Sequence, residues 1–150
     1  MVDARHNVTD VPDSCVFCDV VAGRVAAFEV LRDDVAVAFL DKSPLFPGHT
    51  LVIPTRHVVT LADLEPDEIG PYFARVRAVA AAMPEALDAG GTFVANNNVV
   101  SQSVPHLHVH VVPRTRGDGL RGFFWPRRRY ADGEADSYAD RLRHALSGAV

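Results

Sequence analysis

Histidine and aliphatic residues alternate in the segment His106-Leu107-His108-Val109-His110-Val111-Val112. Alternate side chains of a β-strand point to opposite faces of its sheet. We therefore predict a strand over 106–112, with three imidazoles on one face and Leu107, Val109 and Val111 on the other. The aliphatic face suits a hydrophobic core, so the imidazoles line a polar surface. The alternative is an ordinary half-buried strand, but the chain has only seven histidines, and three in strict alternation are improbable by chance.

Two kinds of chemistry use clustered imidazoles. One is zinc binding, because imidazole is a common zinc ligand. The other is nucleophilic attack on phosphorus, because an imidazole with a pKa of about 6.5 is largely neutral at pH 7. The second ring nitrogen of such a nucleophile must then be held as a donor by a fixed acceptor. Neighbouring histidines can bind a phosphoryl oxygen or protonate the departing group.

Hydrophobic periodicity and turn signals predict the other elements of an α+β fold. The predicted strands span 28–31, 35–40, 49–53, 92–95 and 106–112, and form a mostly antiparallel sheet. One long helix over 64–87 packs on this sheet through Ile69, Tyr72, Phe73, Val76, Val79, Ala80 and Met83, and Pro84 is expected to kink or end it. Shorter helices are predicted over 16–22 and 134–145.

Length and composition favour a single globular domain. The chain has 150 residues, of which 48% are apolar and 23% charged. We predict a disordered lead over 1–14 and one domain over 15–150, with a core at about 15–115 and a C-terminal arm over 116–150. The net charge of −4 argues against binding of a nucleic acid polymer. Neither a secretory signal nor a membrane-spanning run is found, which predicts a cytoplasmic protein with no membrane partner.

Two further sequence features allow more than one interpretation. Cys15 and Cys18, the only cysteines, have the spacing of half a zinc site and also of a redox dithiol. The segment 114–130 combines arginines with aromatic residues, with six arginines against one acid up to Arg129. It could bind phosphates and stack on a base, or it could be a solvated arginine run beside packed aromatic rings.

Several motifs in chain order together resemble the histidine triad (HIT) superfamily over about residues 15–115. The motifs are Cys15-Val16-Phe17-Cys18, Phe39-Leu40-Asp41, Pro47-Gly48-His49-Thr50-Leu51-Val52-Ile53-Pro54, Arg56-His57-Val58 and Gln102-Ser103-Val104-Pro105-His106-Leu107-His108-Val109-His110-Val111-Val112-Pro113-Arg114. The resemblance implies a HIT-like fold with a five-stranded sheet, one long helix and a C-terminal helix. It also implies a homodimer whose sheets join into a ten-stranded sheet.

The resemblance further implies an enzyme that cleaves a nucleoside 5'-phosphate derivative at its α-phosphate. His108 would take up the nucleotidyl group, His110 would contact the phosphate and leaving group, and His49 would orient the imidazoles. The implied nucleotide-binding residues are Asp41 for the ribose hydroxyls, and Asn97, Gln102, Ser103, Val104 and His110 around the phosphates. The substrate would be a phosphoramidate, an adenylated amine or a dinucleoside polyphosphate. No catalytic cofactor is expected.

A subset of the family binds zinc through four residues that are all present in this chain. The implied ligands are Cys15, Cys18, His57 and His106, and four protein ligands leave no open position, so the zinc would be structural. The alternative is a pair of buried thiols beside a solvated His57. Two other functions stay open: a phosphorolytic dinucleoside polyphosphate phosphorylase, and a zinc-stabilised nucleotide-binding module with little turnover.

Overall fold

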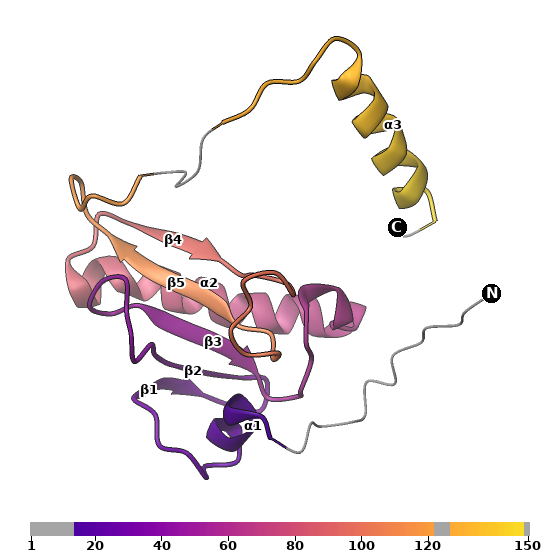
Figure 1. Cartoon of the computed structure of the whole chain (residues 1–150). Coiled ribbons are helices and arrows are strands. Elements are labelled where there is room, and N and C mark those ends of the chain that lie inside the picture. Colours follow the sequence, from indigo (N-terminus) through magenta and orange to yellow (C-terminus); the bar gives the residue numbers. More distant parts are fainter. Residues whose placement is uncertain (1–13, 122–126, 149–150) are drawn as a thin grey trace. The chain divides into compact units, whose positions relative to one another are not determined.

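The computed structural model describes residues 14–121 and 127–148, and it divides after Asp118 into two compact units. The first unit contains a five-stranded sheet in the order β1-β2-β3-β5-β4, in which all neighbouring strands are antiparallel (Figure 1). The strands are β1 (Glu29–Arg32), β2 (Ala36–Leu40), β3 (Thr50–Pro54), β4 (Gly91–Ala95) and β5 (Val109–Arg114). The predicted α+β class and the number of strands are confirmed.

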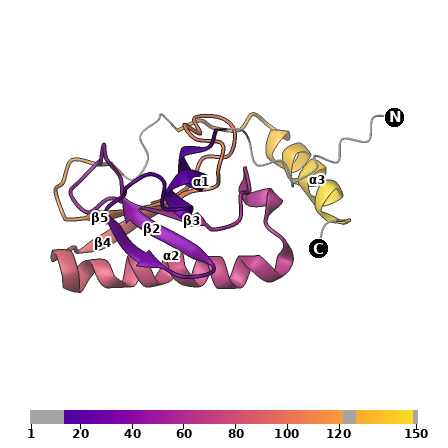
Figure 2. The same cartoon turned by 90° about the horizontal axis from the view of Figure 1, so that it is seen from below.

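One helix lies on each face of the sheet (Figure 2). The long helix α2 (Pro66–Leu87) packs on one face, where alternate strand residues such as Val52 and Val111 form the main core. The short helix α1 (Val16–Val21) lies on the other face, beside Phe39 and Ile53. Because strand side chains alternate, β2 and β3 supply residues to both cores.

Helix α2 begins at Pro66, where a proline is tolerated because no N–H is needed there. The helix continues through Pro84 to Leu87, so the prediction that Pro84 could end it is wrong. A proline so close to the C-terminus removes one hydrogen bond, while Met83 beside it is buried in the core. Ile69, which the pattern predicts in the buried stripe, is exposed. The beginning of α2 extends beyond the strands (Figure 1).

Strand β5 begins at Val109, so the prediction that residues 106–108 belong to it is wrong. The backbone N–H of Leu107 donates to the carbonyl of Val58, at 2.7 Å, instead of to a neighbouring strand. The alternation of faces is nevertheless kept. Leu107 is buried in the core under α2, whereas His106 and His108 lie against Phe17 on the α1 side.

The turn before β3 depends on Gly48. Its φ of +97° lies in the left-handed region that glycine adopts without strain. A Cβ at this position would also overlap the side chain of Leu87, at the last residue of α2. Gly48 therefore lies against the last residue of α2 and directly precedes His49.

The second unit contains α3 (Glu134–Leu146), in the region where a terminal helix is predicted. The predicted lead over 1–14, apart from Ser14, lies outside the described residues, as do residues 122–126 of the arginine and aromatic segment. Among the helices in the described part of the chain, none has the length and apolar character required to cross a membrane.

Candidate functional site

His108 is held in one tautomer by the backbone next to it. Its Nδ1 lies 2.7 Å from the carbonyl oxygen of His106, and because a carbonyl only accepts, Nδ1 carries the proton and donates. The lone pair is therefore on Nε2. The His108 side chain is buried, with an exposed fraction of 3%. An imidazole that acts as a nucleophile needs its second ring nitrogen held as a donor by a fixed acceptor. In this structure, the main-chain oxygen of His106 is that acceptor.

The imidazoles of His49 and His110 form a pair that is also fixed by a backbone group. The N–H of Leu45 donates to Nδ1 of His49 at 3.1 Å, which places the proton of neutral His49 on Nε2. That Nε2 lies 2.9 Å from Nδ1 of His110, so His49 donates and His110 accepts. The proton of neutral His110 is then on its own Nε2. One amide N–H thus determines the tautomers of two histidines.

Burial keeps this pair neutral at pH 7. The pKa of His110 is lowered from 6.5 to about 4, first by burial and then by the neighbouring imidazoles of His108 and His49. Burial also lowers the pKa of His49, and the carboxylate of Asp41 partly opposes this. Neutral imidazoles are required for the directed chain of hydrogen bonds, because an imidazolium has no acceptor nitrogen.

Asp41 lies beside these histidines at the end of β2. Its Oδ2 is 3.8 Å from Nε2 of His49, and its Oδ1 accepts the N–H of Ser43 at 2.8 Å. Asp41, His49 and His110 bring their ligand atoms close enough for a metal ion. The Leu45 N–H argues against that use, because it holds the lone pair of neutral His49 on Nδ1 and the proton on Nε2.

Side-chain amides of the loop before the triad hydrogen-bond to backbone groups of the same loop and of Val59. The Gln102 amide accepts from the N–H of Val99 at 2.8 Å and donates to the carbonyl of Val59 at 2.6 Å. Asn97 donates to the carbonyl of Ser101 at 3.2 Å. Val99 and Ser101 have φ values of +67° and +62°, an uncommon region for residues with a side chain. Ser103 is exposed and Val104 packs against the core under α1.

Cys15, Cys18, His57 and His106 converge on one point, from α1, from the segment after β3 and from the segment before β5. Nδ1 of His106 lies 3.5 Å from Sγ of Cys15 and 3.6 Å from Sγ of Cys18. Nδ1 of His57 lies 3.3 Å from Sγ of Cys18 and 3.2 Å from Nδ1 of His106.

These separations fit a tetrahedral zinc ion. Metal–sulfur bonds of about 2.3 Å and metal–nitrogen bonds of about 2.0–2.1 Å give N–S edges of about 3.5 Å and an N–N edge of about 3.3 Å. His106 is oriented for this role, because its Nε2 donates to the carbonyl of Pro54 at 3.0 Å and leaves Nδ1 as the ligand. Burial raises the pKa of Cys18 to about 12, so a thiolate there requires a cation.

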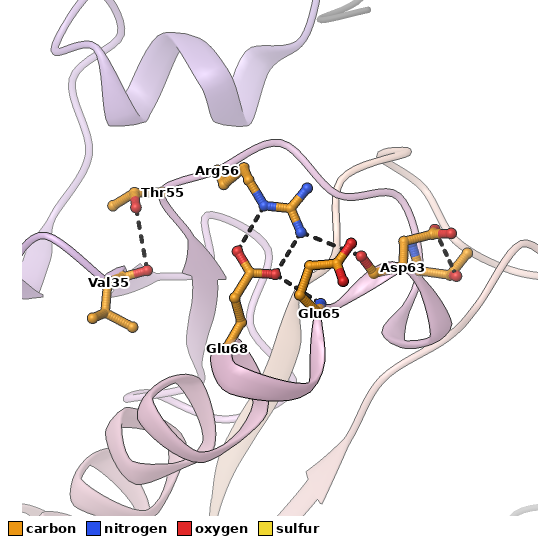
Figure 3. A network of polar contacts seen from close by, with 7 residues as sticks. Val35, Thr55, Arg56, Asp63, Glu65 and Glu68 are labelled. Carbon is orange, nitrogen blue, oxygen red and sulfur yellow. Dashed lines mark hydrogen bonds and ion pairs between the residues drawn. The ribbon is translucent and has the colours of Figure 1, made fainter. Parts of the chain in front are cut away.

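An ion pair fixes the segment that carries His57. Arg56 donates from Nε to Glu68 in the first turn of α2, at 2.7 Å, and from its terminal nitrogen to the carbonyl of Asp63, at 3.3 Å (Figure 3). Thr55 donates to the carbonyl of Val35 on the opposite side of the segment (Figure 3). The two residues before His57 are thereby anchored, Arg56 to α2 and Thr55 to the residue before β2.

Sequence reasoning did not assign a role to Phe17 or to the amide of Leu45. Phe17 lies between Cys15 and Cys18 and contacts both His106 and His108, with ring centroids 6.0 Å and 5.2 Å apart. Its place between the two cysteines of a candidate metal site is a sequence signal that indicates such a role. The Leu45 amide has no sequence signal, because any residue except proline supplies a backbone N–H.

Comparison with known proteins identifies the family. A model of the HIT domain matches residues 23–117, more than half of the chain. The chain belongs to the HIT family. Protein hit of Bacillus subtilis is 36% identical over 116 residues, which cover 75% of this chain and 79% of that protein.

Two further HIT relatives have informative names. A zinc-bound histidine triad family protein from Mycobacterium smegmatis has a crystal structure that is 36% identical, covers 88% of this chain and 97% of that chain, and has a TM-score of 0.68. Adenylylsulfatase HINT3 of Arabidopsis thaliana is 29% identical over 120 residues, which cover 79% of this chain and 61% of that protein. The fold and the histidine triad are thus those of the HIT family.

Proposed function

We propose that this HIT protein hydrolyses a nucleoside 5'-phosphate derivative through a covalent nucleotidyl-His108 intermediate. The observation that carries the proposal is the tautomer of His108, whose lone pair is on Nε2 because Nδ1 donates to the His106 carbonyl. Nε2 attacks the α-phosphorus, and the bond from phosphorus to the leaving group breaks. Water then attacks the same phosphorus, the P–N bond to His108 breaks, and a nucleoside monophosphate is released.

His110 binds the phosphate in both steps. Its Nδ1 accepts from His49, so its Nε2–H is left as a donor to a phosphate oxygen, where it stabilises the developing charge. The leaving group takes a proton from solvent as it departs in the first step, and the attacking water gives up a proton to solvent in the second. The net reaction adds one water molecule across the cleaved bond.

The site and one relative support the proposed substrate class. Asp41 would accept from the ribose hydroxyls, and Asn97, Gln102, Ser103 and the backbone around Val104 would surround the phosphates. Gln102 and Asn97 would have to exchange their present loop contacts for the substrate. The name adenylylsulfatase supports a nucleotide substrate with a good leaving group on its α-phosphate. A phosphoramidate, an adenylated amine and a dinucleoside polyphosphate all have this form.

We also propose that the Cys15, Cys18, His57 and His106 cluster holds a structural zinc ion. The cluster offers four protein ligands at tetrahedral separations, so no position is open for substrate. When bound, zinc would pin α1 to the segments that carry His57 and His106. We further propose that the protein is a cytoplasmic homodimer whose two sheets join. Sedimentation of the purified protein would test whether it is a dimer.

The decisive experiment is release of AMP or GMP from adenosine or guanosine phosphoramidate by native protein and His108→Asn. We expect the variant to lose turnover while keeping nucleotide affinity, and rapid quenching in alkaline denaturant to trap labelled nucleotide on native protein only. Equal turnover in the two proteins would refute the assignment of His108. Parallel reactions with Ap3A and Ap4A, with and without phosphate, identify the preferred leaving group and distinguish hydrolysis from phosphorolysis.

A further inference from the structure

Phe17 lies at the junction of the metal cluster and the triad. Its side chain is buried, and its ring meets the His108 imidazole at a centroid distance of 5.2 Å and an interplanar angle of 79°. The same ring meets His106 at 6.0 Å and 76°, and Phe39 at 5.6 Å and 69°. These edge-to-face contacts are the favourable geometry for aromatic pairs.

The imidazole of His108 needs such a contact to keep its orientation. Within residues 14–121 and 127–148, its one hydrogen bond joins Nδ1 to the His106 carbonyl. A single bond at one edge of a ring leaves rotation about the Cβ–Cγ bond to be restricted by packing. His110 packs on the ring at 5.1 Å and 67°, and Phe17 provides the other aromatic contact among the described residues.

The position of Phe17 is in turn set by the cysteines on either side of it. Cys15 is the N-cap of α1 and Cys18 lies in its first turn, and their thiols converge with His57 and His106. A helix of six residues is not stable by itself, so its anchors determine where its side chains lie. At the other end, Arg32 donates to the carbonyls of Val20 and Val21, both at 2.9 Å.

We infer that Phe17 is a positioning residue for His108, and that a metal ion on the four-ligand cluster fixes the reactive imidazole by holding Phe17 against it. The inference rests on the proposed function in naming His108 as the nucleophile and in placing a metal ion on the cluster. It differs from a purely structural role of the metal, because occupancy of the cluster would change the ring orientation of His108 in protein that is still folded.

The test compares Phe17→Leu with Val20→Ala by nitrogen-15 NMR of the histidine rings at a fixed pH. Val20 is buried on the same helix and in the same core, so it is the matched control. We expect His108 to show one tautomer, with the proton on Nδ1, in native protein and in Val20→Ala. In Phe17→Leu its two ring nitrogens should move toward an average of both tautomers. Unchanged His108 signals in Phe17→Leu, or equal changes in both variants, would overturn the inference.

Removal of zinc from native protein gives the same comparison without a substitution. A chelator should move the His108 signals in the same direction as Phe17→Leu, and added zinc should restore them. His108 signals that do not respond to zinc would exclude the coupling.

The third measurement compares kcat and KM of Phe17→Leu with those of native protein. Misplacement of a reacting group lowers kcat, so Phe17→Leu should lower kcat by about tenfold with KM changed by less than about twofold. A rise in KM at constant kcat would instead assign Phe17 to substrate binding and refute the positioning role. If native protein shows no turnover, the proposed function fails, whereas the NMR result still decides the role of Phe17.

Discussion

Replacing Cys18 with alanine should release zinc and lower the thermal stability of the protein. The Cys18 sulfur lies 3.3 Å from the His57 nitrogen and 3.6 Å from the His106 nitrogen, so its loss opens one corner of the tetrahedron. Three ligands remain, and α1 keeps only the burial of its apolar side chains and the hydrogen bonds of Arg32.

The size of the effect follows from ligand linkage. A ligand present at about 1000 times its Kd stabilises the folded state by about 4 kcal/mol. For a chain of this size, each kcal/mol corresponds to a change in Tm of about 3–4 °C. We therefore expect Tm to fall by about 12–16 °C in Cys18→Ala, and by a similar amount when native protein is treated with a chelator.

The assay measures zinc per chain by elemental analysis and Tm by circular dichroism. Val16→Ala is the control, because Val16 is an exposed residue of the same helix with no place in the cluster. Native protein and this control should hold one zinc per chain, and Cys18→Ala should hold much less. Full zinc content in Cys18→Ala, or a native Tm that does not respond to the chelator, would refute the metal assignment.

Three further predictions concern the neutral imidazole pair and Asp41. His49→Leu should lower kcat about fivefold, because a hydrogen bond worth about 1 kcal/mol no longer orients His110. His49→Gln should keep most activity, since its amide can accept from Leu45 and donate to His110; equal losses would contradict this account. Asp41→Ala should weaken binding of a ribonucleotide more than of a 2',3'-dideoxynucleotide, and equal weakening would exclude the ribose contact. The folded pKa of His110, about 4, lies below its ordinary value of 6.5. The unfolded chain therefore takes up this proton first, and the free energy of unfolding should fall by up to about 3 kcal/mol as the pH drops from about 6.5 to 4. His110→Gln should remove that part of the pH dependence, and identical urea-unfolding profiles for the two proteins would refute it.

The regular elements were predictable because their hydrophobic periods are local. The long helix ends at Leu87, as its pattern predicts, and each predicted strand outside the triad segment lies within one or two residues of an observed strand. The exposure of Ile69 was not predictable in the same way, because a helical period does not indicate where the supporting sheet ends.

The triad segment shows where local reasoning stops. Alternation correctly assigns Leu107 to one core and the imidazoles to the other face. It does not reveal that the Leu107 amide pairs with Val58, or that the His106 carbonyl is used by a side chain. Both contacts compete with the strand ladder and depend on groups brought close only by the fold.

The candidate site was predictable in its residue types and not in its hydrogen-bond directions. Family resemblance supplied the four cysteine and histidine ligands, and the structure brings them together. The direction of the His49 to His110 hydrogen bond depends on the Leu45 amide, which the sequence does not distinguish from other amides.

Gly48 has a consequence for how mutations in this protein would be interpreted. Its φ of +97° strains any residue that has a side chain, and the next residue carries the imidazole that donates to His110. A genetic screen for inactive alleles should therefore recover changes at codon 48 together with changes at the triad codons. Such alleles would encode protein that keeps all the histidines of the site. The loss of activity would come from a displaced His49 backbone, which moves the His49 imidazole away from His110.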